Sequence, residues 1–224
     1  MSYFFNIHHT FFTLFNYPMS YLEFFGTIAG AIAVWLSAKA NIWSWPIGIV
    51  NVVLLFFLFF QVQLYPDMFL QVFFLVTNIM GWWRWGHPRK GEGNHKDELK
   101  VSYTPTRQLL VLSGVGFIGT LIMGALASRL HDFLPSIFNK PSAFPYLDSF
   151  VTVMSIVTTF LMIQKKVECW ILWIIIDVVA TGMYFAKGIK FLGLEYLVFC
   201  FLAAFGLWNW IREYNLTKTA TSST

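Results

Sequence analysis

Seven apolar segments, each close to the length that a helix needs to cross a bilayer, limit most strongly how this chain folds. Lipid offers no hydrogen-bond partner to exposed backbone groups, so a segment that crosses it alone must be helical. Only 12% of the residues are charged and 57% are hydrophobic, whereas about a quarter of a typical soluble chain is charged. The sequence therefore predicts an all-α integral membrane protein. Its expected transmembrane helices are 22–39, 43–62, 67–85, 107–129, 147–164, 168–186 and 190–211.

Basic residues indicate the orientation of these helices. The longest charged stretch, residues 86–107, is rich in Lys and Arg, and such loops favour the cytoplasmic side. Alternating the loops from there places the N-terminus outside and the C-terminus in the cytoplasm. Most basic residues then lie inside, although Lys187 and Lys190 fall outside. The net charge of +4 is therefore read as a topology signal, and no nucleic acid partner is expected.

The first residues read as an interfacial segment. No Lys or Arg occurs among them, so the basic region of a cleaved signal peptide is missing. We expect a short amphipathic stretch on the lipid bilayer, with Phe4, Phe11, Phe12 and Phe15 turned toward lipid.

The pattern Gly-x-Trp-x-Trp closes two parts of the chain, at Gly81 and again at Gly206, 125 positions later. Three apolar segments precede each copy, and one bland, glycine-rich segment separates them. A single linker helix lets two repeats keep the same orientation, which predicts a 3+1+3 arrangement of two parallel three-helix repeats. The expected parts are an N-terminal interfacial segment (1–21), a first repeat (22–85), a cytoplasmic loop (86–106), a linker transmembrane helix (107–130), an external loop (131–146), a second repeat (147–211) and a cytoplasmic tail (212–224).

Polar and aromatic side chains recur at helical spacing inside two of the apolar segments. One stripe begins at Gln71 in the third segment, and another, in the sixth, surrounds Asp177. Ionisable groups at membrane depth are costly and are usually functional, so we expect a polar, aromatic-lined chamber built from both repeats. The predicted substrate-binding residues are Asn51, Gln71, Asn78, Trp82, Trp85, Trp173, Asp177, Thr181, Tyr184, Glu195 and Tyr196.

Other roles remain open for some of these groups. Asp177 could instead pair with an Asn, Thr or Lys of another helix. Trp83 and Trp208 suit interfacial anchoring or repeat packing, and Gly81 and Gly206 suit close helix contact.

Motifs for catalysis and metal binding are absent from the sequence. There is no phosphate-binding G-x-x-x-x-G-K-[ST] loop, no H-E-x-x-H and no serine nucleophile elbow. We therefore expect no cofactor, no metal and no enzymatic activity. Two other classes of function are the alternatives. A membrane enzyme would need a catalytic pair of side chains, and a purely structural or assembly protein would bind no small ligand.

Three stretches carry a family resemblance, namely "WSWPIGIVNVVL" (43–54), "TNIMGWWRW" (77–85) and "WILWIIID" (170–177). In these the chain resembles the PnuC-type vitamin transporters, in particular those for nicotinamide riboside. The resemblance implies a fold similar to that of SWEET sugar transporters and a homo-oligomer, expected to be a trimer. It also implies facilitated diffusion of nicotinamide riboside across the bacterial inner membrane by alternating access, followed by cytoplasmic phosphorylation that traps it for NAD synthesis. Relatives carry thiamine or riboflavin, so another vitamin is the alternative substrate.

Overall fold

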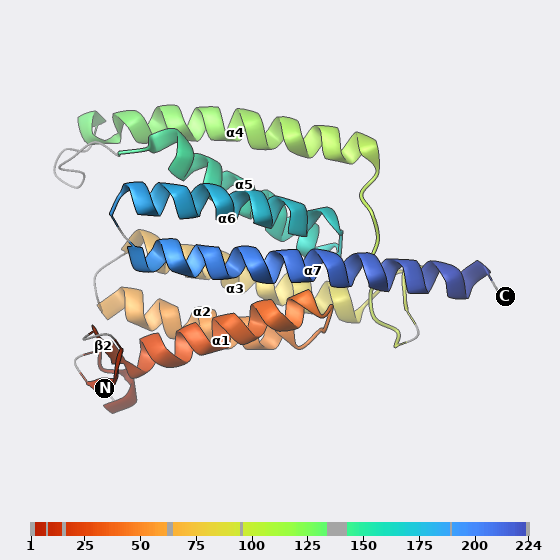
Figure 1. The fold of residues 1–224 in the computed structure, drawn as a ribbon, viewed down its shortest axis with the longest axis horizontal. Coiled ribbons are helices and arrows are strands. Elements are labelled where there is room, and N and C mark those ends of the chain that lie inside the picture. The colour runs from red at the N-terminus through yellow and green to blue at the C-terminus, as the bar shows by residue number, and fades with distance from the viewer. Residues whose placement is uncertain are drawn as a thin grey trace. The chain divides into compact units, whose positions relative to one another are not determined.

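A computed structural model describes residues 3–7, 9–14, 17–61, 65–94, 96–133, 143–188 and 190–222 (Figure 1). The chain forms two compact units, Met1–Lys100 and Val101–Thr224. The first holds α1 (Tyr21–Ala38), α2 (Ser44–Gln61) and α3 (Tyr65–Gly86), and the second holds α4 (Thr106–Phe133), α5 (Pro145–Ile163), α6 (Glu168–Ala186) and α7 (Lys190–Ser222). The prediction of a helical protein is confirmed.

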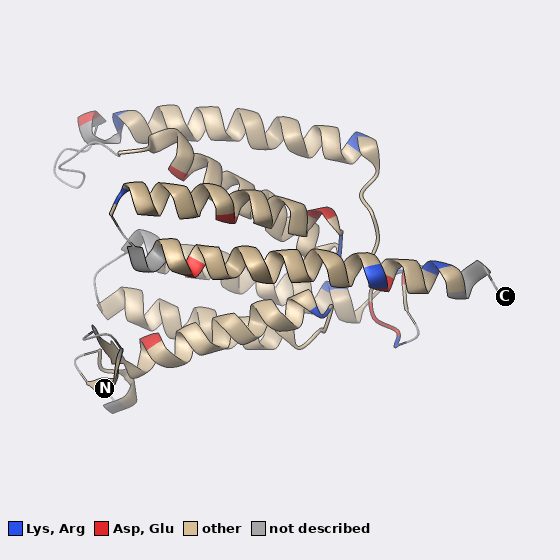
Figure 2. Ribbon diagram, viewed as in Figure 1, with Lys and Arg blue, Asp and Glu red and all other residues tan. Residues whose placement is uncertain are grey.

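Six of the helices in the described residues are long and apolar enough to cross a membrane. The exception is α3, in which Gln71, Thr77, Asn78 and Arg84 interrupt the apolar residues. Charged residues lie mainly near helix ends and in loops (Figure 2). The chain is thus a multi-pass membrane protein, with polar groups concentrated in one helix of its first unit.

The helix α7 is longer than the sequence analysis predicted, because it continues past residue 211 to Ser222. No Gly or Pro follows Gly206, so nothing local ends the helix. Two side chains also bond back to their own helix: the hydroxyl of Thr217 donates to the carbonyl of Glu213, and that of Thr219 to Asn215.

The N-terminal segment forms a 3-10 turn, η1 (Tyr3–Phe5), and an antiparallel hairpin of β1 (Thr10–Leu14) and β2 (Tyr17–Ser20). The ring of Phe11 packs on α1, with ring centroids 4.7 Å from Tyr21 and 4.9 Å from Phe24. Phe4 also lies against α1, whereas Phe12 is half exposed. Phe15 lies outside the described residues. The segment is therefore fastened in part to α1 by aromatic contacts.

Helix α1 begins with a capping box. The Glu23 backbone N–H donates to Ser20 Oγ (3.3 Å), and the Ser20 N–H donates to Glu23 Oε2 (2.8 Å). These bonds satisfy two backbone donors that a helix start leaves free. They fix the point where the hairpin ends and the helix begins.

In the first unit, α2 packs against both α1 and α3. Asn51 of α2 donates from Nδ2 to the Gly26 carbonyl of α1 at 2.8 Å. Gly30 gives this amide room, since a Cβ there would lie 3.0 Å from Asn51 Nδ2. A hydrogen bond from a polar side chain thus links these two apolar helices.

In the second unit, the pairs α4–α5, α5–α6 and α6–α7 pack together. The segment before α4 lies along the turn between α5 and α6, where Ser102 exchanges backbone hydrogen bonds with Lys165 (3.1 Å) and Val167 (3.0 Å). Glu168 accepts from both the N–H and the hydroxyl of Thr104, each at 2.9 Å. These bonds hold the segment before α4 against the turn between α5 and α6, within the second unit.

The turns after α1 and α5 have the same form. Ala40 (φ 53°) and Lys165 (φ 55°) are left-handed. In each turn the residue itself and the one after it donate to carbonyls of the last helical turn, the Schellman pattern. These positions are 125 apart, as are Gly81 and Gly206.

A tryptophan pair also repeats at this spacing. Trp45 meets Trp85 edge-on at 5.3 Å and 90°, and Trp170 meets Trp210 at 5.5 Å and 87°. In each pair the first indole covers a glycine, Gly81 or Gly206, so closely that a Cβ would collide with it. The internal similarity seen in the sequence therefore extends to local packing within each unit.

Candidate binding site

The second unit brings most of its predicted site residues together on α6 and α7. Asp177 lies in the middle of α6 and is only 3% exposed. In the part of the chain that the structure describes, no hydrogen bond or ion pair reaches its carboxylate. Asp177 of α6 lies near Tyr196 and Cys200 of α7. A buried carboxylate that no protein partner satisfies can serve a cationic ligand or a bound proton.

Two tyrosines form a flat surface next to this carboxylate. Tyr184 of α6 and Tyr196 of α7 stack with ring centroids 5.3 Å apart and planes inclined by 18°. Glu195, half-buried on α7, directly precedes Tyr196 in the chain, and Asp177 also lies near Tyr196. Stacked rings beside two carboxylates suit a flat, positively charged ligand.

Unpaired hydroxyls lie on the neighbouring helices. Thr181, one turn after Asp177, has a buried Oγ1 without a hydrogen-bond partner, and so does the fully buried Thr158 of α5. By contrast, Thr152 and Thr159 of α5 donate to carbonyls of their own helix. These two hydroxyls of α5 thus satisfy carbonyls of their own helix and are not left unpaired.

Trp173 is half-buried on the face of α6 that carries Asp177. The neighbouring Trp170 is packed on Trp210 instead. The described residues contain no cluster of three His, Cys, Asp or Glu side chains that could hold a metal ion.

In the first unit, the predicted amides are used mainly for helix packing. Asn78 donates from Nδ2 to the Phe74 carbonyl at 2.8 Å, and its Oδ1 lies against Gly48 of α2. Asn51 bonds the Gly26 carbonyl, and Gln71 is buried with 7% exposure. Asn51 and Asn78 keep further hydrogen-bonding capacity, and the roles of all three amides in binding remain predictions.

The two tryptophans of α3 differ in environment. Trp85 is wholly buried against Trp45, whereas Trp82 is 46% exposed. Trp82 and Trp85 share the helical spacing of Asn78, but they do not line one accessible surface. The indole of Trp45 on α2 covers Trp85. Trp83 and Trp208 are 63% and 58% exposed, which agrees with interfacial anchoring.

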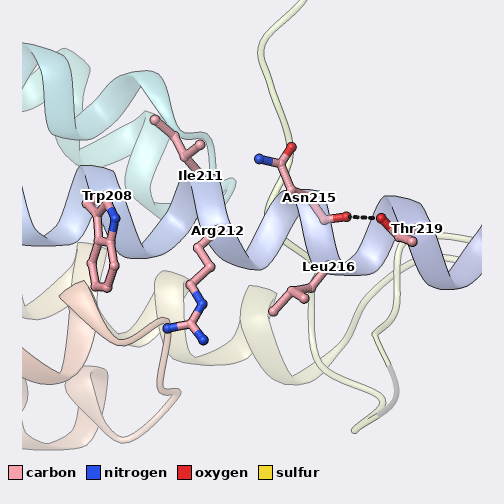
Figure 3. A pocket seen from close by; sticks show the side chains of 6 residues that line it. All are labelled: Trp208, Ile211, Arg212, Asn215, Leu216 and Thr219. Carbon is pink, nitrogen blue, oxygen red and sulfur yellow. Dashed lines mark hydrogen bonds between the residues drawn. The ribbon is translucent and has the colours of Figure 1, made fainter.

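A shallow groove of about 330 Å³ lies on α7, away from the predicted residues. Trp208, Arg212 and Leu216 project from one side of the helix, and Asn215 and Thr219 also line the groove (Figure 3). It is open and lined by one helix, whereas small-molecule sites are usually concave and enclosed. We therefore assign the candidate site to the α6–α7 cluster.

The sequence analysis missed one pair near this cluster. Lys187, at the end of α6, holds both carboxylate oxygens of Asp148 on α5, at 2.7 and 2.9 Å. The sequence contains one signal that Lys187 lies near the cluster, because it follows Tyr184 by three residues and so shares its helical face.

A multi-pass helical membrane protein with a buried carboxylate beside stacked rings has the features expected of a small-molecule transporter. The family model described as nicotinamide mononucleotide transporter matches residues 20–212, and the chain belongs to this family.

Similar proteins include the nicotinamide riboside transporter PnuC of Escherichia coli (strain K12), 34% identical over 88% of both chains. The protein of the same name from Neisseria mucosa is 26% identical over 87% of this chain and 73% of its own. The riboflavin/roseoflavin transporter RibM of Streptomyces davaonensis is 24% identical over 89% and 88%. A crystal structure of the vitamin B3 transporter PnuC matches with a TM-score of 0.63 at 23% identity, covering 88% of this chain and 83% of that one. This likeness shows a shared fold.

Proposed function

We propose that this protein carries nicotinamide riboside across the membrane. The observation that carries the proposal is the 34% identity, over 88% of both chains, with a protein named for that transport. The chemistry of the α6–α7 cluster supports it. Nicotinamide riboside joins a flat pyridinium cation to a ribose, so stacked tyrosines and a carboxylate complement its ring, and hydroxyl and amide groups complement the sugar.

The same cluster favours the riboside over its phosphorylated form. Asp177 and Glu195 are both acidic, and Lys187, a basic residue beside the cluster, is already paired with the carboxylate of Asp148. A phosphate brought close to two carboxylates would be repelled, and this repulsion is strong where water is scarce. We therefore infer that the mononucleotide of the family's description binds more weakly here than the riboside.

Transport is proposed to proceed by alternating access. In this scheme α3 also crosses the membrane, and two parallel three-helix repeats flank the linker helix α4. The predicted residues Asn51, Gln71, Asn78 and Trp82 of the first unit are proposed to contact the substrate during this cycle as well. The spacing of 125 residues between the two Trp–Gly contacts supports two equivalent repeats.

The direction and setting of transport are further parts of the proposal. The protein works in a bacterial inner membrane, with its N-terminus outside and its C-terminus in the cytoplasm, as a homotrimer. Diffusion is passive, and phosphorylation in the cytoplasm keeps the substrate inside. Uptake into proteoliposomes that contain no kinase should therefore stop when the two concentrations are equal.

Binding of purified protein to a ligand panel tests the substrate. Nicotinamide riboside should raise the melting temperature, because a ligand that binds only the folded state stabilises it. Nicotinamide mononucleotide, thiamine and riboflavin should do so less at equal concentration. A larger shift with thiamine or riboflavin would make that vitamin the substrate, and no shift with any of them would remove the carrier assignment.

Substitutions test the site. Asp177→Asn should weaken riboside binding at least tenfold, and Asn78→Ala should weaken it less, since that amide already bonds Phe74. Glu213→Gln, on α7 beyond the cluster, is the matched control and should leave affinity unchanged. If folded Asp177→Asn binds as tightly as the unmodified protein, the α6–α7 cluster is not the site.

A further inference from the structure

An ion pair between Lys187 and Asp148 connects α5 and α6 at the end of their helical hairpin that lies opposite the turn. A tight turn at residues 164–167 connects the two helices at one end. At the other end, Lys187 Nζ lies 2.7 and 2.9 Å from the two carboxylate oxygens of Asp148. The side chains of this ion pair are only 20% and 37% exposed, so water screens it less than a pair on the surface.

Each charge of the pair is placed where the helix ends favour it. Lys187 is the C-cap of α6, at the negative end of that helix, and Asp148 lies in the first turn of α5, at its positive end. Neutralising one residue therefore leaves the other charge in a favourable place. The two charges can be removed one at a time without reversing the local electrostatics of either helix.

The pair borders the stacked tyrosines. Lys187 Nζ lies 5.6 Å from the centre of the Tyr184 ring, within the range of a cation–π contact. Tyr184 in turn stacks on Tyr196. A protein cation thus occupies the kind of position, over an aromatic face and beside a carboxylate, that a pyridinium ring would seek.

We propose that the Asp148–Lys187 pair sets the charge beside the Tyr184–Tyr196 rings and thereby determines how strongly the site prefers a cationic ring over a neutral one. This inference rests on the proposed function. While the pair is intact its charges cancel, and attraction for a cation comes from Asp177 and Glu195. Losing Lys187 leaves Asp148 to add to that attraction, whereas losing Asp148 leaves Lys187 to oppose it.

Comparing two ligands of nearly equal shape separates the effect of ligand charge on binding from the effect of packing. One is nicotinamide riboside, and the other is its reduced dihydropyridine form, which has the same ribose and amide but no positive charge. We would measure both dissociation constants by calorimetry for the purified full chain and for Lys187→Gln, Asp148→Asn and the double variant. The selectivity is the ratio of the two constants.

The expected changes have opposite signs. Lys187→Gln should raise selectivity for the cationic form by about fivefold, and Asp148→Asn should lower it by about as much, as expected for one charge several ångströms away in a partly dry site. The double variant should return near the original ratio, because the net charge is again zero. Lys187→Arg keeps the charge and should keep the ratio.

A purely structural pair would give another pattern. Both single variants would then weaken both ligands alike, and the double variant would be no better; this result, or an unchanged ratio in all variants, would overturn the inference. Melting temperatures of the same samples show whether each variant is folded. If one single neutral variant is not folded, the other still decides the question, because it should move the ratio in its own direction while Lys187→Arg does not. If the unmodified protein binds neither ligand, the proposed function itself fails, and the inference fails with it.

Discussion

Gly81 and Gly206 show how single residues shape each unit. Both lie under the ring of a buried tryptophan, Trp45 or Trp170, that packs edge-on against a second tryptophan. For Gly206, a Cβ would lie 2.6 Å from the Trp170 ring. Because these rings are rigid and wholly or almost wholly buried, the helix backbone would have to move to admit a methyl group.

Gly206→Ala should therefore destabilise the protein by about 2 kcal/mol, the usual cost of overpacking. Gly114→Ala is the matched control, since a Cβ there meets nothing within 4 Å, and helix propensity favours alanine by up to about 1 kcal/mol. Unfolding in detergent, followed by fluorescence or circular dichroism, measures both. Equal stability of the two variants would show that the contact between Gly206 and Trp170 is not tight in solution.

Glu92 gives a prediction about pH. Its carboxylate accepts a hydrogen bond from Arg84 at 2.6 Å, and chiefly this bond lowers the pKa of Glu92 below its ordinary value of 4.5. A lowered pKa means that the contact stabilises the loop after α3 at neutral pH and is lost as the pH falls through the lowered pKa. Arg84→Gln should raise the pKa of Glu92 toward its ordinary value, as an NMR titration of the side chain would reveal. An unchanged pKa would mean that the ion pair does not persist.

At the scale of elements, the ends of α1 and α5 explain how two helical hairpins form without glycine. Ala40 and Lys165 take the left-handed conformation, which costs a residue with a Cβ roughly 1–2 kcal/mol. Lys165 is buried, with 1% exposure, so its side chain contributes packing that offsets part of the strain. Ala40 has only a methyl group to offer.

Ala40→Gly should accordingly stabilise the protein by about 0.5–1 kcal/mol, since glycine removes the steric cost at this C′ position. Lys165→Gly should not stabilise, because it also removes the buried side chain. Thermal unfolding of the two variants in parallel gives the comparison. Destabilisation by Ala40→Gly would indicate that its methyl group packs more than the geometry implies.

At the scale of the whole molecule, the helices agree with the sequence prediction at most of their ends. The chain has six helices able to cross a membrane among its described residues, and it belongs to a family of transporters. The charge asymmetry of the loops predicts the orientation, with the N-terminus outside and the C-terminus in the cytoplasm.

Single cysteines can test this orientation. In a chain with Cys169 and Cys200 replaced by Ser, Asn6→Cys should react with an impermeant maleimide added to intact cells. Thr219→Cys should react only after the membrane is opened. The basic loop 86–107 favours the cytoplasm, and alternating the loops from there places the C-terminus on the same side. The reverse pattern would invert the topology without changing the fold.

The sequence by itself determined the helices, their approximate ends and the spacing of the repeat, because a segment that crosses lipid must satisfy its own backbone. It also contains the Ser20–Glu23 capping box at the start of α1. Only the tertiary structure decided which polar groups are available: Asn51 bonds Gly26 and Trp85 packs under Trp45, whereas Asp177 stays unsatisfied among the described residues. The physical reason is that helical spacing places a side chain on a face, but what that face meets depends on helices distant in the chain.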